Sequence, residues 1–253
     1  MACCVCAAFI SVRPSISQQV RVGVQREIPV GKLTEMESML ALANPGQKAG
    51  LLTRLGVEAP IATDVTEHLL PDEEIKLRSV RTREPAHYGV AFLPSGAGVS
   101  CYLYLLQEED GDSAKILWHV VDQRQLNCWA GSSSLEMISL RDGREDALVL
   151  HDVTAGHGSG LLLKETQIFS VVNGKLHETL RTEDYHAEDH LNADERVLKR
   201  STFLRFPDDT LEETRTSSVN DKLQKVERRY WHWSEKQQKF IASGFLKVAA
   251  ATP

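Results

Sequence analysis

Histidine and aspartate residues stand close together at two places in the chain, and both residue types can bind metals or transfer protons. At the first place, His151 and Asp152 are followed by His157 within a glycine-rich stretch. The alternative interpretation is structural, with Asp152 capping a turn and both histidines on the surface. We favour this interpretation, because no cysteine or glutamate stands at a spacing that would complete a metal site.

The second place is an acidic segment over residues 182–197. His186 and His190, with Asp189 between them, have the spacing of a metal-binding pair on a helix. Ala187 stands where the zinc-protease motif requires glutamate. We therefore expect an exposed loop or short surface helix that binds a divalent ion weakly at most.

Other motifs for nucleophilic or phosphate chemistry are incomplete. Ser132 to Ser134 follow Gly131 without forming the G-x-S-x-G turn of hydrolases. Gly96 and Gly98 are not followed by the Lys-Ser/Thr pair of a phosphate-binding loop, and no dinucleotide fingerprint occurs. The sequence thus predicts no cofactor and no assigned catalytic residue.

Aromatic residues are the best candidates for ligand binding. Tyr230, Trp231 and Trp233 lie close together, and Trp118 and Trp129 occur earlier in the chain. On a strand, Trp231 and Trp233 would project from one face and Tyr230 from the other. An exposed tryptophan pair could stack on a carbohydrate or a peptide, whereas an inward pair would fill the core, which is the interpretation we favour.

Short apolar runs separated by turn residues place these side chains on antiparallel strands. The turns include Asp142-Gly143 and Asn173-Gly174, which supply the positive φ angles of tight hairpins. No helical pattern separates the runs, so a parallel sheet is excluded. The predicted strands are Ile75–Arg81, His87–Leu93, Val99–Gln107, Lys115–Asp122, Leu135–Leu140, Ala147–His151, Leu161–Val172, Lys175–Arg181, Arg200–Phe206, Leu211–Val219, Leu223–Trp233 and Lys239–Ser243.

One part of this pattern resembles a known repeat. The segment Ile138–Leu150, with its Asp142-Gly143 turn, the residues Arg144 to Asp146 and the strand Ala147–Leu150, is similar to the FG-GAP repeat of integrin-α-type β-propellers. The resemblance continues over the following strands to Leu176. Tyr230–Phe240 resembles the closing aromatic hairpin of such bacterial proteins.

The resemblance implies a propeller whose loops bind Ca²⁺ through carboxylates at alternate positions. Here Ser139 and Arg141 stand at the aligned ligand positions, so we predict that no calcium binds. The predicted strands would also make only about three four-stranded blades. A propeller-like fragment, a sandwich and a half-open barrel therefore all remain possible for an antiparallel, mainly β meander.

The residues before the strands divide into two regions. Residues 1–19 have the length of an export signal but lack its basic start, so they are either a truncated signal or a disordered terminus. Residues 20–74 are expected to form an extended arm and a small helical cap. One helix starts at Thr34, which has capping-box spacing to Glu37, and a second spans Gln47–Leu55. Residues 75–248 form the β domain and residues 249–253 a tail.

Composition excludes several classes of partner. The net charge of −6 argues against nucleic acid, which needs a basic surface. No apolar run reaches the roughly 20 residues of a membrane span. Cys101 and Cys128 would pair as a disulfide in an exported protein or pack as small hydrophobic residues in a cytosolic one.

These observations favour an exported, non-enzymatic bacterial protein of binding or structural role, located in the periplasm or outside the cell, with a protein or carbohydrate ligand. A cytoplasmic location is the alternative. The alternative function is a hydrolase or metal-dependent enzyme that uses His151, Asp152 and His157, or His186 and His190.

Overall fold

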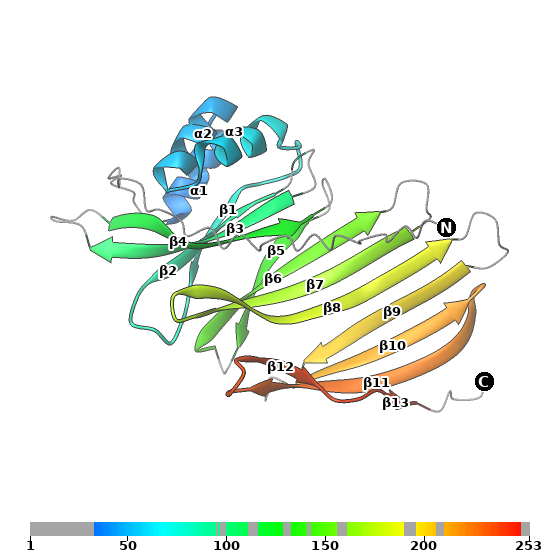
Figure 1. Ribbon diagram of the computed structural model, residues 1–253. Coiled ribbons are helices and arrows are strands. Elements are labelled where there is room, and N and C mark those ends of the chain that lie inside the picture. Colours follow the sequence, from blue (N-terminus) through cyan, green and yellow to red (C-terminus); the bar gives the residue numbers. More distant parts are fainter. Residues whose placement is uncertain are drawn as a thin grey trace, which may run out of the picture.

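The computed structural model describes residues 33–94, 96, 100–110, 116–128, 133–140, 143–155, 161–189, 196–205 and 210–248. Within these residues the helices precede all of the strands, and every sheet is antiparallel (Figure 1). The prediction of a mainly β, antiparallel chain with a small helical N-terminal cap is therefore confirmed. The helices are α1 (Leu33–Leu42), α2 (Pro45–Arg54) and α3 (Ala59–His68).

Local chemistry explains where α2 begins. The side chain of Asn44 accepts a hydrogen bond from the Gln47 amide at 3.0 Å, and the Gln47 side chain accepts one from the Asn44 amide at 3.1 Å. Pro45 stands in the first turn, where its missing N–H leaves no bond unmade. In α1, by contrast, Glu37 accepts hydrogen bonds from Leu77 and Arg78, so this carboxylate ties the helix to the sheet.

The third helix, α3, lies within the predicted helical cap, in the stretch from Val57 to Glu74, whose sequence pattern is mixed and singles out no helix. Pro60 reads there as a helix breaker, yet it occupies the first turn of α3. Ala62, Val65 and Thr66 are buried on one face of the helix. Packing of that face against the sheet, rather than a sequence signal at its start, accounts for the helix.

The helices cover one face of a four-stranded sheet, which we call the small sheet (Figure 1). Its strands follow chain order as a meander. Gly89 allows α1 to approach closely, because a Cβ at this position would overlap the Leu33 side chain. The strands are β1 (Lys76–Val80), β2 (Tyr88–Leu93), β3 (Ser100–Asp110) and β4 (Ile116–Asn127).

The remaining strands form a curved nine-stranded sheet, the large sheet (Figure 1). Consecutive strands pair from β5 to β12, and β13 pairs with β11 beside β12. Positive φ angles at Asn173, Gly174 and Gly143 fit the hairpin turns predicted there. The strands are β5 (Ser134–Leu140), β6 (Glu145–Ala155), β7 (Leu161–Val172), β8 (Lys175–Asp189), β9 (Arg196–Arg205), β10 (Leu211–Val219), β11 (Lys222–Ser234), β12 (Lys239–Ala242) and β13 (Leu246–Lys247).

Strand β8 runs into the acidic segment predicted to be a loop or surface helix. Its pairing with β9 continues to Asp189, which lies opposite Arg196. For residues 182–189 the prediction was therefore wrong. Thr182 and Ala187 are buried, and the two flanking strands satisfy the backbone, so the acidic composition did not prevent a strand. Residues 190–195 lie outside the described residues.

The two sheets pack face to face, as in a sandwich, and the large sheet is buried on both faces. One face of β6 contributes Leu148 and Leu150 to a core shared with the small sheet. The other face contributes Ala147 and Val149 to a separate core formed as the large sheet curves and β12 comes to lie against β8. The members of that core are Leu140, Ala147, Val149, Ile168, Leu180, Leu211, Trp231 and Phe240.

An arginine joins the edge strand of the small sheet, β1, to β6 of the large sheet. Arg81, at the end of β1, donates from Nη2 and Nε to Asp146 Oδ1 at 2.7 and 3.1 Å. The backbone amides of the two residues also bond across: Arg81 N to Asp146 Oδ2 and Asp146 N to the Arg81 carbonyl, each at 2.9 Å. Burial raises the pKa of the Asp146 carboxyl, but the hydrogen bonds and charge of Arg81 outweigh it and hold that pKa below its ordinary value of 3.8.

A second connection lies at the turn between β7 and β8. The Gly174 amide donates to Glu84 Oε2 at 3.2 Å, and the Leu176 amide donates to Asp122 Oδ2 at 2.8 Å. Arg124 returns a bond from Nη2 to the Leu176 carbonyl at 2.8 Å. The small sheet therefore fixes one end of the large sheet, and the other end of β6 to β9 extends beyond it (Figure 1).

Replacement of Arg81 tests whether its contacts with Asp146 stabilise the packing of the two sheets. Arg81→Met removes the counter-charge of a carboxylate that is only 8% exposed, so we expect the free energy of unfolding at pH 7 to fall more than in a variant that loses a more exposed pair. Arg83→Met is the control: its exposed pair with Glu145, at 2.5 Å, should contribute less than about 1 kcal/mol. Urea unfolding measures both variants, and equal losses would contradict the role of Arg81.

The same variants make a pH prediction. Because the folded-state pKa of Asp146 is lowered, its stabilising effect is complete above pH 3.8 and is lost as the pH falls through the folded-state value. In Arg81→Met only burial acts strongly on this carboxyl and raises its pKa. The difference in stability between wild type and Arg81→Met should therefore begin to shrink as the pH falls through the raised pKa of the variant, above 3.8, and should vanish once the pH has passed the lowered pKa of the wild type. A difference that is constant from pH 7 to pH 3 would contradict this assignment.

Candidate functional site on the face of the large sheet

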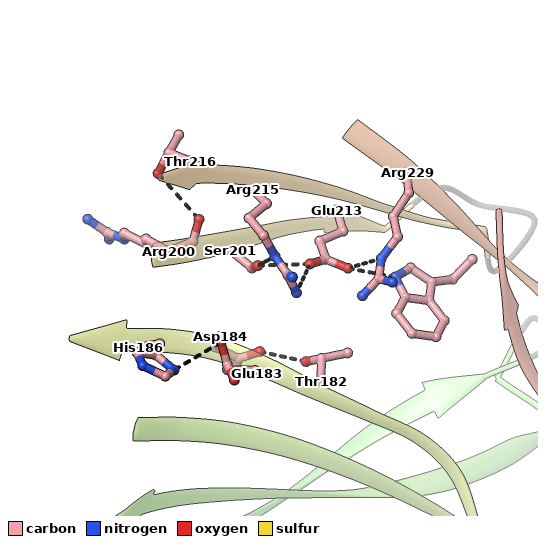
Figure 2. A network of polar contacts seen from close by, with 11 residues as sticks. Thr182, Glu183, Asp184, His186, Arg200, Ser201, Glu213, Arg215, Thr216 and Arg229 are labelled. Carbon is pink, nitrogen blue, oxygen red and sulfur yellow. Dashed lines mark hydrogen bonds and ion pairs between the residues drawn. The ribbon is translucent and has the colours of Figure 1, made fainter. Parts of the chain in front are cut away.

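A fully buried carboxylate is the centre of a polar cluster on the large sheet. Glu213 of β10 is 0% exposed. Its carboxylate accepts hydrogen bonds from Arg229 Nε at 2.5 Å, Ser201 Oγ at 2.8 Å, Arg215 Nη2 at 2.9 Å and Trp231 Nε1 at 3.0 Å. Figure 2 shows both guanidinium groups pointing toward this carboxylate.

Strand register brings these side chains to one face, which we call the Glu213 face. Glu213 lies opposite Phe203 of β9 and Arg229 of β11, and Arg215 lies opposite Ser201. Residues that oppose each other in antiparallel strands project to the same side. The Glu213 face is thus the polar continuation of the core that contains Leu211 and Trp231, since these residues are two positions along the same strands.

The electrostatics keep Glu213 ionised. Burial alone would raise the pKa of its carboxyl. Hydrogen bonds from Arg229, Ser201 and Trp231, together with the charge of Arg229, lower the pKa by more than burial raises it, so the net shift is downward. One negative charge then faces two guanidinium groups. Glu227, opposite Arg215, does not balance this excess, because its carboxylate pairs with Lys225 Nζ at 2.7 Å.

Aromatic rings stack on the guanidinium groups. The Arg229 guanidinium lies 4.3 Å from the ring centroid of Trp231 and 4.3 Å from that of Phe245. The same Phe245 ring lies 4.8 Å from the Arg215 guanidinium. Such stacking orients an arginine without using its N–H groups, which lie in the guanidinium plane.

A second hydrogen-bonded chain lies on the same face, on β6 to β8. His151 Nδ1 is 2.8 Å from Thr166 Oγ1, and Thr166 donates its hydroxyl proton to Asp184. Thr182 Oγ1 donates to the other Asp184 oxygen at 2.6 Å. Because the Thr166 proton is used by Asp184, the hydroxyl must accept from His151 Nδ1–H. In the neutral ring the lone pair is then on Nε2, which lies 3.8 Å from Glu136 Oε2, and the His151 side chain is 42% exposed.

The structure does not bring the predicted histidine and aspartate residues together. Asp152 follows His151 on a strand and so points to the opposite face, where it lies across from Glu165. Burial raises the pKa of the Glu165 carboxyl, the charge of Arg181 lowers it in part, and that of Asp152 raises it again. His157 lies outside the described residues.

The other predicted pair is equally separate. His186 Nδ1 lies 3.4 Å from Glu183 Oε1, and His190 lies outside the described residues, as does the side chain of Asp189. Across the described ranges no group of three or more His, Cys, Asp or Glu residues is arranged to hold a metal ion.

The aromatic candidates lie mostly in cores. Trp231 is only 9% exposed and its indole N–H is bonded to Glu213, so it offers no open stacking surface. Trp233 packs edge-on against Phe240, 5.3 Å between ring centroids, and Tyr230 is half-buried on the opposite face. Trp118 is buried beneath the helices, and Trp129 lies outside the described residues.

The hairpin compared above with the FG-GAP repeat contacts the positively charged side chain of Arg81. Besides Asp146, the Arg81 guanidinium donates to Ser139 Oγ at 2.6 Å and to the Gly143 carbonyl at 2.9 Å. Three groups of this hairpin, Asp146, Ser139 and the Gly143 carbonyl, are thus engaged by Arg81. Arg141 and Asp142 lie outside the described residues.

Cys101 and Cys128 form a disulfide in the core between the two sheets, with their Cα atoms 5.6 Å apart. Both side chains are buried. The bond joins β3 to the end of β4, so it constrains the small sheet where it faces the large one.

The arginine cluster was missed in the sequence. Arg229 belongs to a basic group with Lys222, Lys225 and Arg228 that reads as a solvated strand face, and Arg228 does pair with Glu212 near the surface. The sequence did contain a signal for this cluster, because Glu213 and Arg215 are two positions apart on one strand and Arg229 and Trp231 are two positions apart on the next. Both pairs alternate as one face of a strand would.

No family model, no curated protein and no solved structure matches this chain. Over the described residues, no helix has the length and apolar character required to cross a membrane.

Removal of the Glu213 charge tests the cluster. Glu213→Gln leaves two poorly exposed guanidinium groups without a counter-ion, and we expect a loss of about 3–5 kcal/mol in the free energy of unfolding. Glu212→Gln is a matched control one residue away on the opposite face, where the Arg228 pair at 3.1 Å should contribute about 1 kcal/mol or less. Similar losses in the two variants would show that Glu213 has no special role.

Proposed function

We propose that this chain is an exported, non-enzymatic β-rich protein that binds a ligand on the Glu213 face of its large sheet. The observation that carries the proposal is the charge of the cluster: two guanidinium groups share one carboxylate. Arg215 and Arg229 have side chains only 21% and 18% exposed, so water screens the extra positive charge weakly. A ligand from a protein or carbohydrate partner that brings a negative group would complete the pairing.

The disulfide supports export. Disulfides persist in the periplasm and outside cells, and they are rare where thiols are kept reduced. Cys101 and Cys128 are 27 positions apart, so closing that loop restricts the unfolded chain considerably. A periplasmic or extracellular location fits this bond better than the cytoplasmic alternative.

The alternative function remains an enzyme, and one observation favours His151 among its candidate residues. The chain from His151 through Thr166 to Asp184 fixes the tautomer, as a general base requires. His151→Ala separates the two functions: it should leave ligand binding at Arg215 unchanged, whereas an enzyme that uses this base would lose its activity.

The state of the cysteines tests export. In protein isolated from its native compartment and unfolded without reductant, we expect Cys101 and Cys128 to resist alkylation and to appear as one cross-linked peptide pair by mass spectrometry. The double variant Cys101→Ala/Cys128→Ala should lose about 3–4 kcal/mol of stability relative to the oxidised protein. Alkylation of both thiols without reductant would support the cytoplasmic alternative.

Native mass spectrometry tests ligand binding itself. Protein taken from the native compartment should carry an additional mass that is released on denaturation. Arg215→Gln should reduce its occupancy, and Arg228→Gln, on the opposite face, should not. If no bound molecule is found under conditions that preserve the fold, the proposed function is wrong.

A further inference from the structure

The two arginines keep hydrogen-bonding capacity that the described protein does not use. A guanidinium has five N–H groups. Arg229 donates only through Nε to Glu213, and Arg215 donates through Nε to Ser201 and Nη2 to Glu213. Within the described residues the remaining N–H groups of both side chains have no acceptor.

The geometry directs these free groups toward a ligand. The rings of Trp231 and Phe245 each lie 4.3 Å from the Arg229 guanidinium and restrict approach to its faces, so we expect a further partner to meet its edge, where the N–H groups lie. The Arg215 guanidinium donates to the same Glu213 carboxylate as Arg229, so the two guanidinium groups lie on either side of that carboxylate (Figure 2). A planar anion that accepts two parallel hydrogen bonds matches such an edge.

An exposed aromatic ring borders the arginines. Phe203 lies directly opposite Glu213 in the strand pairing and diagonally to Arg215, and it is 38% exposed. It therefore projects from the same face. A ring attached to the anion could stack on Phe203 while the anion meets the guanidinium edge.

From this arrangement we propose that Arg215 and Arg229 bind the carboxylate of a ligand whose six-membered ring stacks on Phe203. This inference rests on the proposed function and specifies its ligand. A single carboxylate matches the one unbalanced positive charge of the cluster. The ring could be that of a sugar acid or of an aromatic acid, since both present this chemistry.

Isothermal titration calorimetry with three probes tests the proposal. Methyl β-glucuronide and benzoate represent the two sources of the ring carboxylate, and methyl β-glucoside is the neutral match of the first. We expect at least one acid to bind and the glucoside to bind at least about tenfold more weakly than the better acid, as loss of a charge-assisted bond predicts. The better acid identifies the source of the ring.

Variants locate the binding. Arg215→Gln should weaken the better acid about tenfold, and it leaves Glu213 with Arg229, Ser201 and Trp231 as partners. Phe203→Ser should weaken binding of the better acid several-fold. If Arg215→Gln does not fold, Phe203→Ser is the variant that shows whether the acid binds at this site. The control Arg228→Gln should not change the affinity.

Three results would overturn the inference. They are binding of the glucoside as tight as that of the better acid, an affinity for the better acid that both site variants leave unchanged, and no binding of either acid. If native mass spectrometry nevertheless finds a bound molecule, the proposed function stands and only the ligand class is wrong.

Discussion

The alternation of side chains along β6 to β8 is the constraint on which the rest of the structure depends. These strands are buried on both faces, so successive residues serve different cores. Leu148 and Leu150 pack toward the small sheet, and Ala147 and Val149 pack toward the curved end of the large sheet. A shift of one residue in register would exchange the two cores and would also turn His151 and Asp152 to the wrong sides. The disulfide packs in the core on one face of these strands, and Trp231 of β11 packs in the core on the other.

Two buried carboxylates show the same chemical solution used with different results. Asp146 and Glu213 both lose most contact with water, and each is held ionised by arginine from another strand. At Asp146 the pairing is complete, because one guanidinium also engages the neighbouring hairpin through Ser139 and the Gly143 carbonyl. At Glu213 two guanidinium groups share the carboxylate. The first arrangement joins sheets, and the second leaves a charge for which the described chain supplies no partner.

Local patterns predicted the elements, and long-range register decided the site. Turn residues such as Asn173-Gly174 and the short apolar runs between the turns were sufficient to predict the antiparallel fold, because both can be recognised from residues that are close in the sequence. Helix α3 was missed because Pro60 reads as a breaker until its position in the first turn is known. The extension of β8 was missed because its acidic residues resemble a loop. Glu213 and Arg229 are 16 positions apart, and only the pairing of β10 with β11 shows that they meet.

The path of the chain after β12 has a consequence for access to the arginines. Phe245 lies between β12 and β13, and both of these strands pair with β11, which carries Arg229. β13 pairs through Leu246 and Lys247, opposite Arg228 and Glu227, and the Val248 amide donates to the Val226 carbonyl at 3.0 Å. Local opening of so short a pairing costs far less than opening of the sheet. The ring over the guanidinium groups can therefore move aside while β10, β11 and the Glu213 carboxylate stay in place, so exchange at the cluster is decoupled from global unfolding.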